Sequence, residues 1–194
     1  MNKSALQIIG AIGCALLLPL SSSLAGPVTD EELAGLNAQP GSVFDETYVH
    51  LTRLPLSLRS VHVNIGIEDA STRRQLSERD LERLRSEFQA DLESGYVSPG
   101  GTVSLEVTLV DLVPNFVLAT NGGRTARHRP SSGIGSATME AVFRNAETGE
   151  VLMVIRDKRE GLGLTHNPHM ITQQVWGDVT DILEDWAQDL PGAL

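Results

Sequence analysis

The sequence predicts an α+β fold, a two-layer sandwich in which two helices cover a mainly antiparallel sheet of about four strands. Three segments alternate apolar and polar residues with the period of two that is typical of a strand, and a fourth is a short apolar run. Two longer segments repeat apolar residues with the period of an amphipathic helix. Their order, β-α-β-β-β-α, favours a sheet with helices on one face.

The N-terminal residues have the pattern of an export signal. Lys3 supplies a positive charge, the stretch Ala5–Leu20 is almost wholly apolar, and Ser23 and Ala25 place small residues at positions −3 and −1 of a cleavage site. We therefore expect residues 1–25 to be a signal peptide and the protein to be periplasmic. A membrane anchor is the alternative, but no stop-transfer cluster of basic residues follows.

The single cysteine, Cys14, gives a second route of processing. Ala11–Cys14 resembles the lipobox of bacterial lipoproteins, although the apolar run continues beyond it. Processing there would give an outer-membrane-anchored lipoprotein, and we expect membrane contact only in that case. Cleavage after Ala25 would instead leave no cysteine for disulfides or thiolate chemistry.

Residues 26–47 are predicted to be a flexible N-terminal segment. Thr29 could cap one helical turn, but Gly35 and the pair Pro40–Gly41 stop that turn early. The other predicted boundaries are a single domain over residues 48–190 and a tail over residues 191–194.

The first half of the domain contains one clear strand and one clear helix. A short strand is a candidate at Tyr48–Leu51, and alternation predicts a stronger one over Val61–Ile67, with His62 on its polar side. The helix is predicted from Glu78 to Ser94, capped by Ser77. Its apolar stripe is made of Leu81, Leu84, Phe88 and Leu92.

The second half contains three strands and a final helix. The strands are predicted at residues 103–109, 137–143 and 151–155, and the last two are joined by a hairpin that ends near Gly149. The final helix is predicted to begin at Pro168, capped by Asn167, and to end at Pro191. Trp186 lies on its apolar stripe, whereas Trp176 flanks that stripe, where a partner could cover it.

Charge narrows the classes of partner. Acidic residues outnumber basic ones by 25 to 15, which gives a net charge of −10. Such a surface repels nucleic acid and anionic lipid in general, so we expect no nucleic-acid partner.

The sequence contains no recognisable catalytic or metal-binding constellation, and we expect no cofactor. His166 and His169 form the tightest histidine pair, but they straddle the predicted helix start and lack the further ligands of a zinc site. Gly133–Gly135 precedes a strand and lacks the third glycine of a dinucleotide loop. No Gly-x-Ser-x-Gly motif is present to supply a serine nucleophile.

One glycine-rich segment concentrates positive charge in this acidic chain. Arg124, Arg127, His128 and Arg129 fall within ten residues of each other. They are the candidate residues for binding an anionic group or a partner, because arginine pairs well with carboxylate and phosphate. A solvated loop between strands is the alternative interpretation.

The stretch Gly135–Leu152, followed by Asp157–Arg159, resembles domain-of-unknown-function family 3313, a group of exported Gram-negative envelope proteins. The matching features are a small residue and a glutamate entering the first strand, a Thr-Gly-Glu turn, and Asp and Arg leaving the second strand. The likeness extends over roughly Tyr48–Leu190. Many members resemble lipoproteins, a feature that this chain matches only through Cys14, and the family implies no activity.

Three hypotheses about function remain open. The first is a non-catalytic binding or assembly accessory whose partner is an envelope protein or a cell-wall component. The second is a hydrolase of envelope polymers that uses acids such as Glu106 and Glu140 on the polar faces of adjacent strands. The third is a module that forms homo-oligomers through an exposed strand edge.

Overall fold

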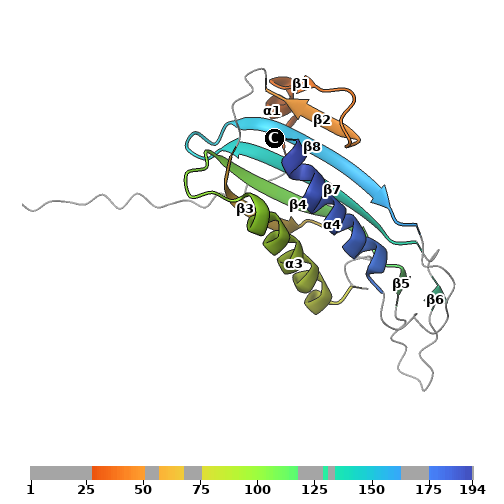
Figure 1. Cartoon of the computed structure of the whole chain (residues 1–194). Coiled ribbons are helices and arrows are strands. Elements are labelled where there is room, and N and C mark those ends of the chain that lie inside the picture. Colours follow the sequence, from red (N-terminus) through yellow and green to blue (C-terminus); the bar gives the residue numbers. More distant parts are fainter. Residues whose placement is uncertain are drawn as a thin grey trace, which may run out of the picture.

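In the computed structural model, the described residues are 28–50, 57–67, 76–117, 129–130, 134–162 and 175–193, and they form an α+β domain with one main sheet (Figure 1). The helices are α1 (Asp30–Ala34), α3 (Glu78–Tyr96) and α4 (Gly177–Gly192). The strands are β1 (Asn37–Ala38), β2 (Glu46–Val49), β3 (Leu58–Ile65), β4 (Val103–Val113), β5 (Phe116–Val117), β6 (Arg129–Pro130), β7 (Ser136–Asn145) and β8 (Val151–Glu160).

The main sheet has six strands in the order β1-β2-β8-β7-β4-β3, which is more than the four predicted. All neighbours are antiparallel except β3 and β4, which are parallel. Parallel strands need a long crossover, and α3 supplies it. The α+β class is therefore confirmed, with a mixed sheet. Strands β5 and β6 form a separate two-stranded ribbon.

Helices α3 and α4 lie side by side on one face of the sheet (Figure 1). Their apolar stripes pack against the inward-facing side chains of the strands, as the periodicity predicts. Trp186, Phe88 and Phe143 are at most 1% exposed and form the bulk of this core. Helix α3 packs mainly against β3, whereas α4 packs against β7 and β8.

The N-terminal residues predicted to be a flexible segment instead form α1, β1 and the first half of β2. A capping box between Thr29 and Glu32 starts α1, and Val28 packs with Leu33 and Leu36 in a small apolar cluster. The cluster includes Val142, which alternates with the core-facing residues of β7. The segment therefore covers part of the sheet face opposite α3 and α4, a long-range contact that no local pattern reveals.

Strand β8 runs five residues beyond the predicted end at Ile155. Its next two positions on the helix-covered face are Asp157 and Arg159, which bind the side chains of Trp186 and Asp189 on α4. Because the inward positions here hold charged residues, the alternation of apolar and polar residues that identifies a strand is lost.

The helix ends also differ in detail from the prediction. Ser77 has the extended backbone of an N-cap, but its side chain forms no capping bond to α3. Helix α4 begins at Gly177, after a turn, and not at Pro168, which lies outside the described residues. Pro191, predicted to end the final helix, lies inside the last turn of α4, which ends one residue later at Gly192. Trp176 is 6% exposed, so the fold itself covers the side chain that a partner could have covered.

A buried ionic cluster fastens α4 to the sheet. The Asp157 carboxylate, 4% exposed, accepts hydrogen bonds from Trp186 Nε1 at 2.7 Å, Arg159 Nε at 2.8 Å and the backbone N–H of Asp45 at 2.9 Å. Arg159 also donates to Asp189 of α4 at 2.8 Å. Burial disfavours the charge of Arg159, but the bonds to Asp189 and Asp157 outweigh it and raise the pKa of the guanidinium.

Replacing Asp157 with alanine should lower the free energy of unfolding by about 3 kcal/mol, because it leaves Arg159 and the Trp186 N–H without a buried acceptor. Urea unfolding followed by Trp fluorescence measures this. Lys158→Ala is the matched control, since that neighbouring side chain is 57% exposed and, within the described part of the chain, forms an ion pair with Glu160 alone. Its effect should stay below about 0.5 kcal/mol. Equal unfolding midpoints for the two variants would contradict the assignment.

Candidate functional site

The basic residues singled out in the sequence cannot be placed as a site. Arg124, Arg127 and His128 lie outside the described residues, as do Cys14 and the pair His166 and His169. Arg129 begins β6 and its backbone pairs with Val117 of β5, but its side chain is not described. The anion-binding hypothesis for these residues stays a prediction.

Glu106 and Glu140 do come close to each other, on the sheet face opposite α3 and α4. Thr108 of β4 pairs with Glu140, and Glu106 pairs with Val142 of β7, so the two acids are diagonal neighbours on one face. Glu140 binds Arg156 at 2.8 Å, and Glu106 lies 3.6 Å from Arg144. Each carboxylate therefore belongs to an ion pair, and this geometry offers no support for the hydrolase hypothesis.

The same arginines continue the pairing toward the N-terminal segment. Arg144 binds Glu32 of α1 at 2.9 Å, and Arg156 lies 3.9 Å from Glu46 of β2. Acids and arginines thus alternate across this face, which ties α1 and β2 to the central strands. These charges stabilise the arrangement of the fold.

Asp178, at the start of α4, is another buried carboxylate with a structural role. Its Oδ2 accepts the backbone N–H of Gly135 at 2.8 Å, and its own N–H donates to Asn115 Oδ1 at 3.1 Å. A Cβ on Gly161 would overlap the Asp178 side chain, so glycine is required there for the strand end to approach α4. Asp178 joins the ends of β4, β7 and β8 to the helix.

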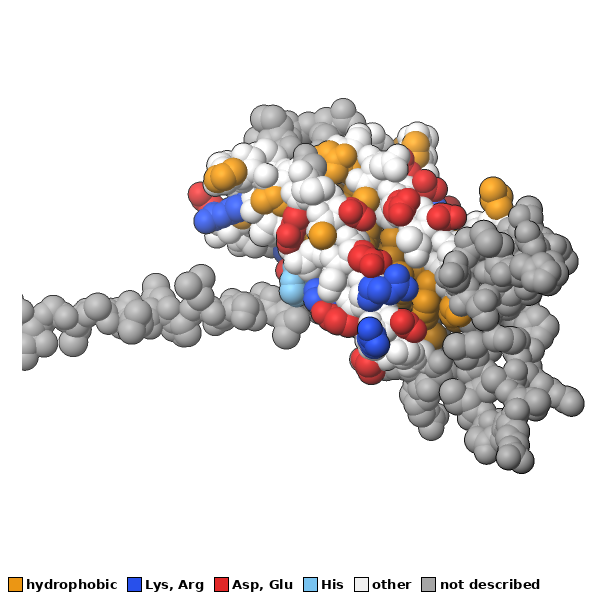
Figure 2. Space-filling model, turned by 60° about the horizontal axis from the view of Figure 1, so that its bottom comes forward, with side chains coloured by type: hydrophobic (Ala, Val, Ile, Leu, Met, Phe, Trp, Pro, Cys, Tyr) orange, Lys and Arg blue, Asp and Glu red, His pale blue; other side chains and the backbone are white. Residues whose placement is uncertain are grey.

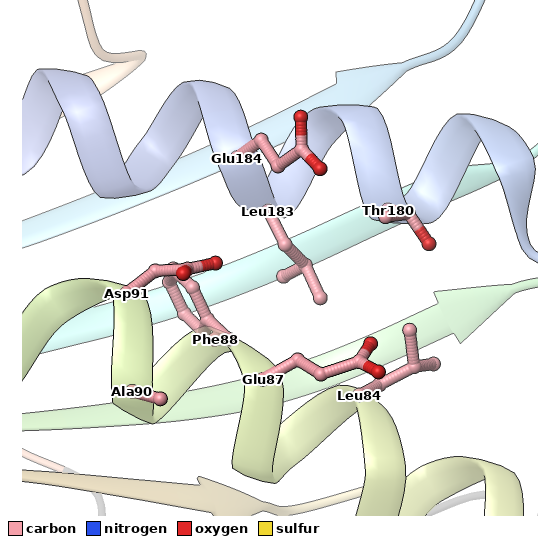
Figure 3. Close-up of a pocket in the computed structure, with 8 residues that line it drawn as sticks. All are labelled: Leu84, Glu87, Phe88, Ala90, Asp91, Thr180, Leu183 and Glu184. Carbon is pink, nitrogen blue, oxygen red and sulfur yellow. The ribbon is translucent and has the colours of Figure 1, made fainter.

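A groove of about 280 Å³ lies between α3 and α4 (Figure 3). Leu84 and Phe88 of α3 and Leu183 of α4 form an apolar floor, and Figure 3 shows Leu183 pointing from α4 toward α3. The other lining residues are Glu87, Ala90, Asp91, Thr180 and Glu184. An apolar floor beside three carboxylates is an arrangement that can bind a cationic, partly aliphatic group.

The charges around the groove are mostly unbalanced. Helix α4 carries no lysine or arginine, and its acids are Asp178, Asp181, Glu184, Asp185 and Asp189. Glu87 pairs with Arg83 at 3.4 Å, whereas Asp91 and Glu184 form no ion pair with a described residue. Apolar side chains are visible between acidic ones in the space-filling view (Figure 2). The groove therefore attracts cations and repels anions.

Sequence reasoning missed the groove because it is formed by two helices that are far apart in the chain. The apolar stripes and the outward acids of α4 were visible, but nothing local indicated that Glu184 would lie across from Glu87 and Asp91. In the parts of the chain that the structure describes, no three histidine, cysteine or acidic side chains are grouped as metal ligands. Nor does any helix there have the length and apolarity to cross a membrane.

Comparison with known proteins identifies no family, because neither a family model nor a curated protein matches the chain. The resemblance to family 3313 therefore stays a prediction. Among solved structures, the chain is similar to a variant PelC dodecamer from Paraburkholderia phytofirmans, with 12% identity, a TM-score of 0.38, and coverage of 74% of this chain and 94% of that one. It is also similar to a minor lipoprotein from Acinetobacter baumannii, with 10% identity, a TM-score of 0.31, and coverage of 66% and 87% respectively. Both scores are too low to identify a function.

The ion pair of Glu32 should make the fold sensitive to acid. The backbone N–H of Thr29 and the guanidinium of Arg144 hold the pKa of Glu32 below its ordinary 4.5. A lowered folded-state pKa gives stability that is present above the unfolded pKa and is lost as the pH falls through the folded pKa. At pH 7, Glu32→Gln should therefore cost about 0.5 kcal/mol, a small value because the side chain is 34% exposed.

The difference in the free energy of unfolding between the unchanged protein and the Glu32→Gln variant should shrink as the pH falls from about 5 to about 3. Urea unfolding at several pH values measures it. Glu31→Gln, in the same turn of α1, removes an equal charge that is exposed and lies outside these bonds. If both variants follow the same pH profile, the ion pair does not contribute.

Proposed function

We propose that this chain is an exported envelope protein that acts in the periplasm as a non-catalytic binding or assembly accessory, with the α3–α4 groove as its binding surface. One contrast supports this function. The acids that could do chemistry elsewhere, Glu106, Glu140, Asp157 and Asp178, are bonded to the fold itself. The groove carboxylates Asp91 and Glu184 have no such partner among the described residues.

The partner is an envelope protein or a component of the cell wall. The net charge of −10 disfavours nucleic acid and anionic membrane surfaces. Lipidation at Cys14 would bring the domain to a membrane, whereas cleavage after Ala25 would leave it free in the periplasm. Intact mass of the processed protein separates these two routes.

The basic segment supplies a second contact in this proposal. Arg124, Arg127, His128 and Arg129 are suited to an anionic group, whereas the groove is suited to a cationic one. A partner with charges of both signs could engage both, which would favour one orientation of binding.

A photoreactive amino acid at position 90 should capture the partner in living cells. Ala90 lines the groove and is exposed, so a reactive side chain there would touch whatever binds. We expect a discrete cross-linked band, identified by mass spectrometry, that weakens when Asp91 and Glu184 are changed to lysine. Glu147, exposed in the β7–β8 turn, is the control position.

Two results would rule out the groove as the binding surface. One is the same cross-linked bands from positions 90 and 147, and the other is a band from position 90 that keeps its intensity when Asp91 and Glu184 are changed to lysine. Charge reversal of Arg124, Arg127 and Arg129 to glutamate should weaken the same band if the basic segment contributes. A band with the mass of two copies would assign the groove to self-association.

A homo-oligomeric module is the second candidate, because β3 is an eight-residue strand at the edge of the sheet. Edge strands present unpaired backbone groups that can add another strand. One outward donor, the N–H of Val63, is met by the Gln89 side chain at 3.4 Å. His62 and Arg59 are exposed along this strand.

Light scattering after size exclusion tests the edge contact. If β3 pairs with a second copy, the mass should rise with concentration, and His62→Lys should keep the protein monomeric by placing like charges across the new pair. Ser94→Lys adds the same charge on an exposed position of α3 and should have no effect. A strict monomer at all concentrations would end this hypothesis.

A further inference from the structure

We infer that the α3–α4 groove is a receptor for one arginine side chain of a partner polypeptide, which inserts its aliphatic stem between the helices and its guanidinium among the carboxylates. This inference rests on the proposed function and specifies the chemistry of the partner. It follows from the size of the groove, the character of its floor and the charges of its rim.

The floor is too limited to anchor a large apolar side chain. Leu84 and Phe88 are each 1% exposed and Leu183 is 4% exposed, so most of their surface is already buried in the core. An aromatic anchor gains its affinity by burying on the order of 150–250 Å², which this floor cannot match. A slender alkyl stem needs much less surface, and arginine buries such a stem while keeping its charged end in contact with polar groups.

The rim offers acceptors from both helices. Asp91 comes from α3 and Glu184 from α4, and neither has an ion-pair partner among the described residues. Among the described residues, Glu87 pairs with exposed Arg83 alone, a weak surface pair that a better-placed guanidinium can replace. The Thr180 hydroxyl adds a neutral acceptor on the α4 side.

Other ligand classes agree less well with this groove. A metal ion would need a tight ligand set, and the described residues contain none. An anion would face three carboxylates. A guanidinium, in contrast, has five donors in one plane and can bind two carboxylates at once, whereas an ammonium acts as a single point charge.

The test is an NMR titration of the ¹⁵N-labelled protein with acetyl-Ala-Arg-Ala-amide at physiological salt. We expect shift changes confined to the groove, at the amides of Glu87 to Asp91 and Thr180 to Glu184. Acetyl-Ala-citrulline-Ala-amide has the same shape without the charge and should bind about fivefold more weakly.

Two double variants distinguish binding in the groove from a general attraction between the acidic protein and a cationic peptide. Asp91→Asn with Glu184→Gln should weaken binding of the arginine peptide about fivefold. Asp181→Asn with Asp185→Asn removes the same charge from exposed positions of α4 outside the groove and should leave binding unchanged. Three results would each overturn the inference. They are equal affinity for the citrulline and arginine peptides, an equal loss of affinity in both double variants, and NMR shift changes spread over all acidic positions.

The outcomes also distinguish this inference from the proposed function. A cross-linked partner at position 90 together with equal binding of the arginine and citrulline peptides would retain the groove as a binding surface and reject the arginine. Absence of both a cross-linked partner and peptide binding would reject both.

Discussion

The buried carboxylate of Asp157 helps to hold α4 on the sheet, and the position of the α3–α4 groove depends on where α4 lies. Its oxygens accept from Trp186, Arg159 and the backbone of Asp45, so helix, strand and the turn before β2 meet at one charge. Burying a charge is costly unless it is paired and hydrogen-bonded. The bonds to Asp157 therefore favour the observed placement of α4.

With α4 in place, the groove is a consequence of packing two helices on one sheet. The apolar stripes of α3 and α4 turn toward the strands, which leaves polar positions such as Glu87 and Glu184 along the seam. In a chain with excess acid, those positions bring negative charge together. The opposite face of the sheet differs, because there acids meet arginines such as Arg144 and Arg156 and neutralise each other. The proposed binding surface and the structural surface thus arise from the same kinds of residue.

Periodicity predicted the helices and strands that bury one wholly apolar face, and it failed where buried positions also hold charged residues. The stripe of α3 and the alternation in β4 and β7 have one apolar face each, and those elements are confirmed. The end of β8 was missed because Asp157 and Arg159 point inward as a bonded pair. The helical turn that Thr29 could cap is present as α1 and ends before Gly35, but its packing on the sheet was missed, because five residues cannot form a stable helix alone and the contacts of this segment with Val142 and Arg144 are long-range.

The sequence by itself determined the α+β class, the presence of two long helices, the start of α3 and the acidic character of the chain, because each is a property of neighbouring residues. Only the tertiary structure decided the parallel pairing of β3 with β4, the role of Asp157 and the groove between α3 and α4. Each of these joins residues that are distant in the chain. Hydrophobic period indicates which face of an element is buried, but it does not indicate which other element will bury it.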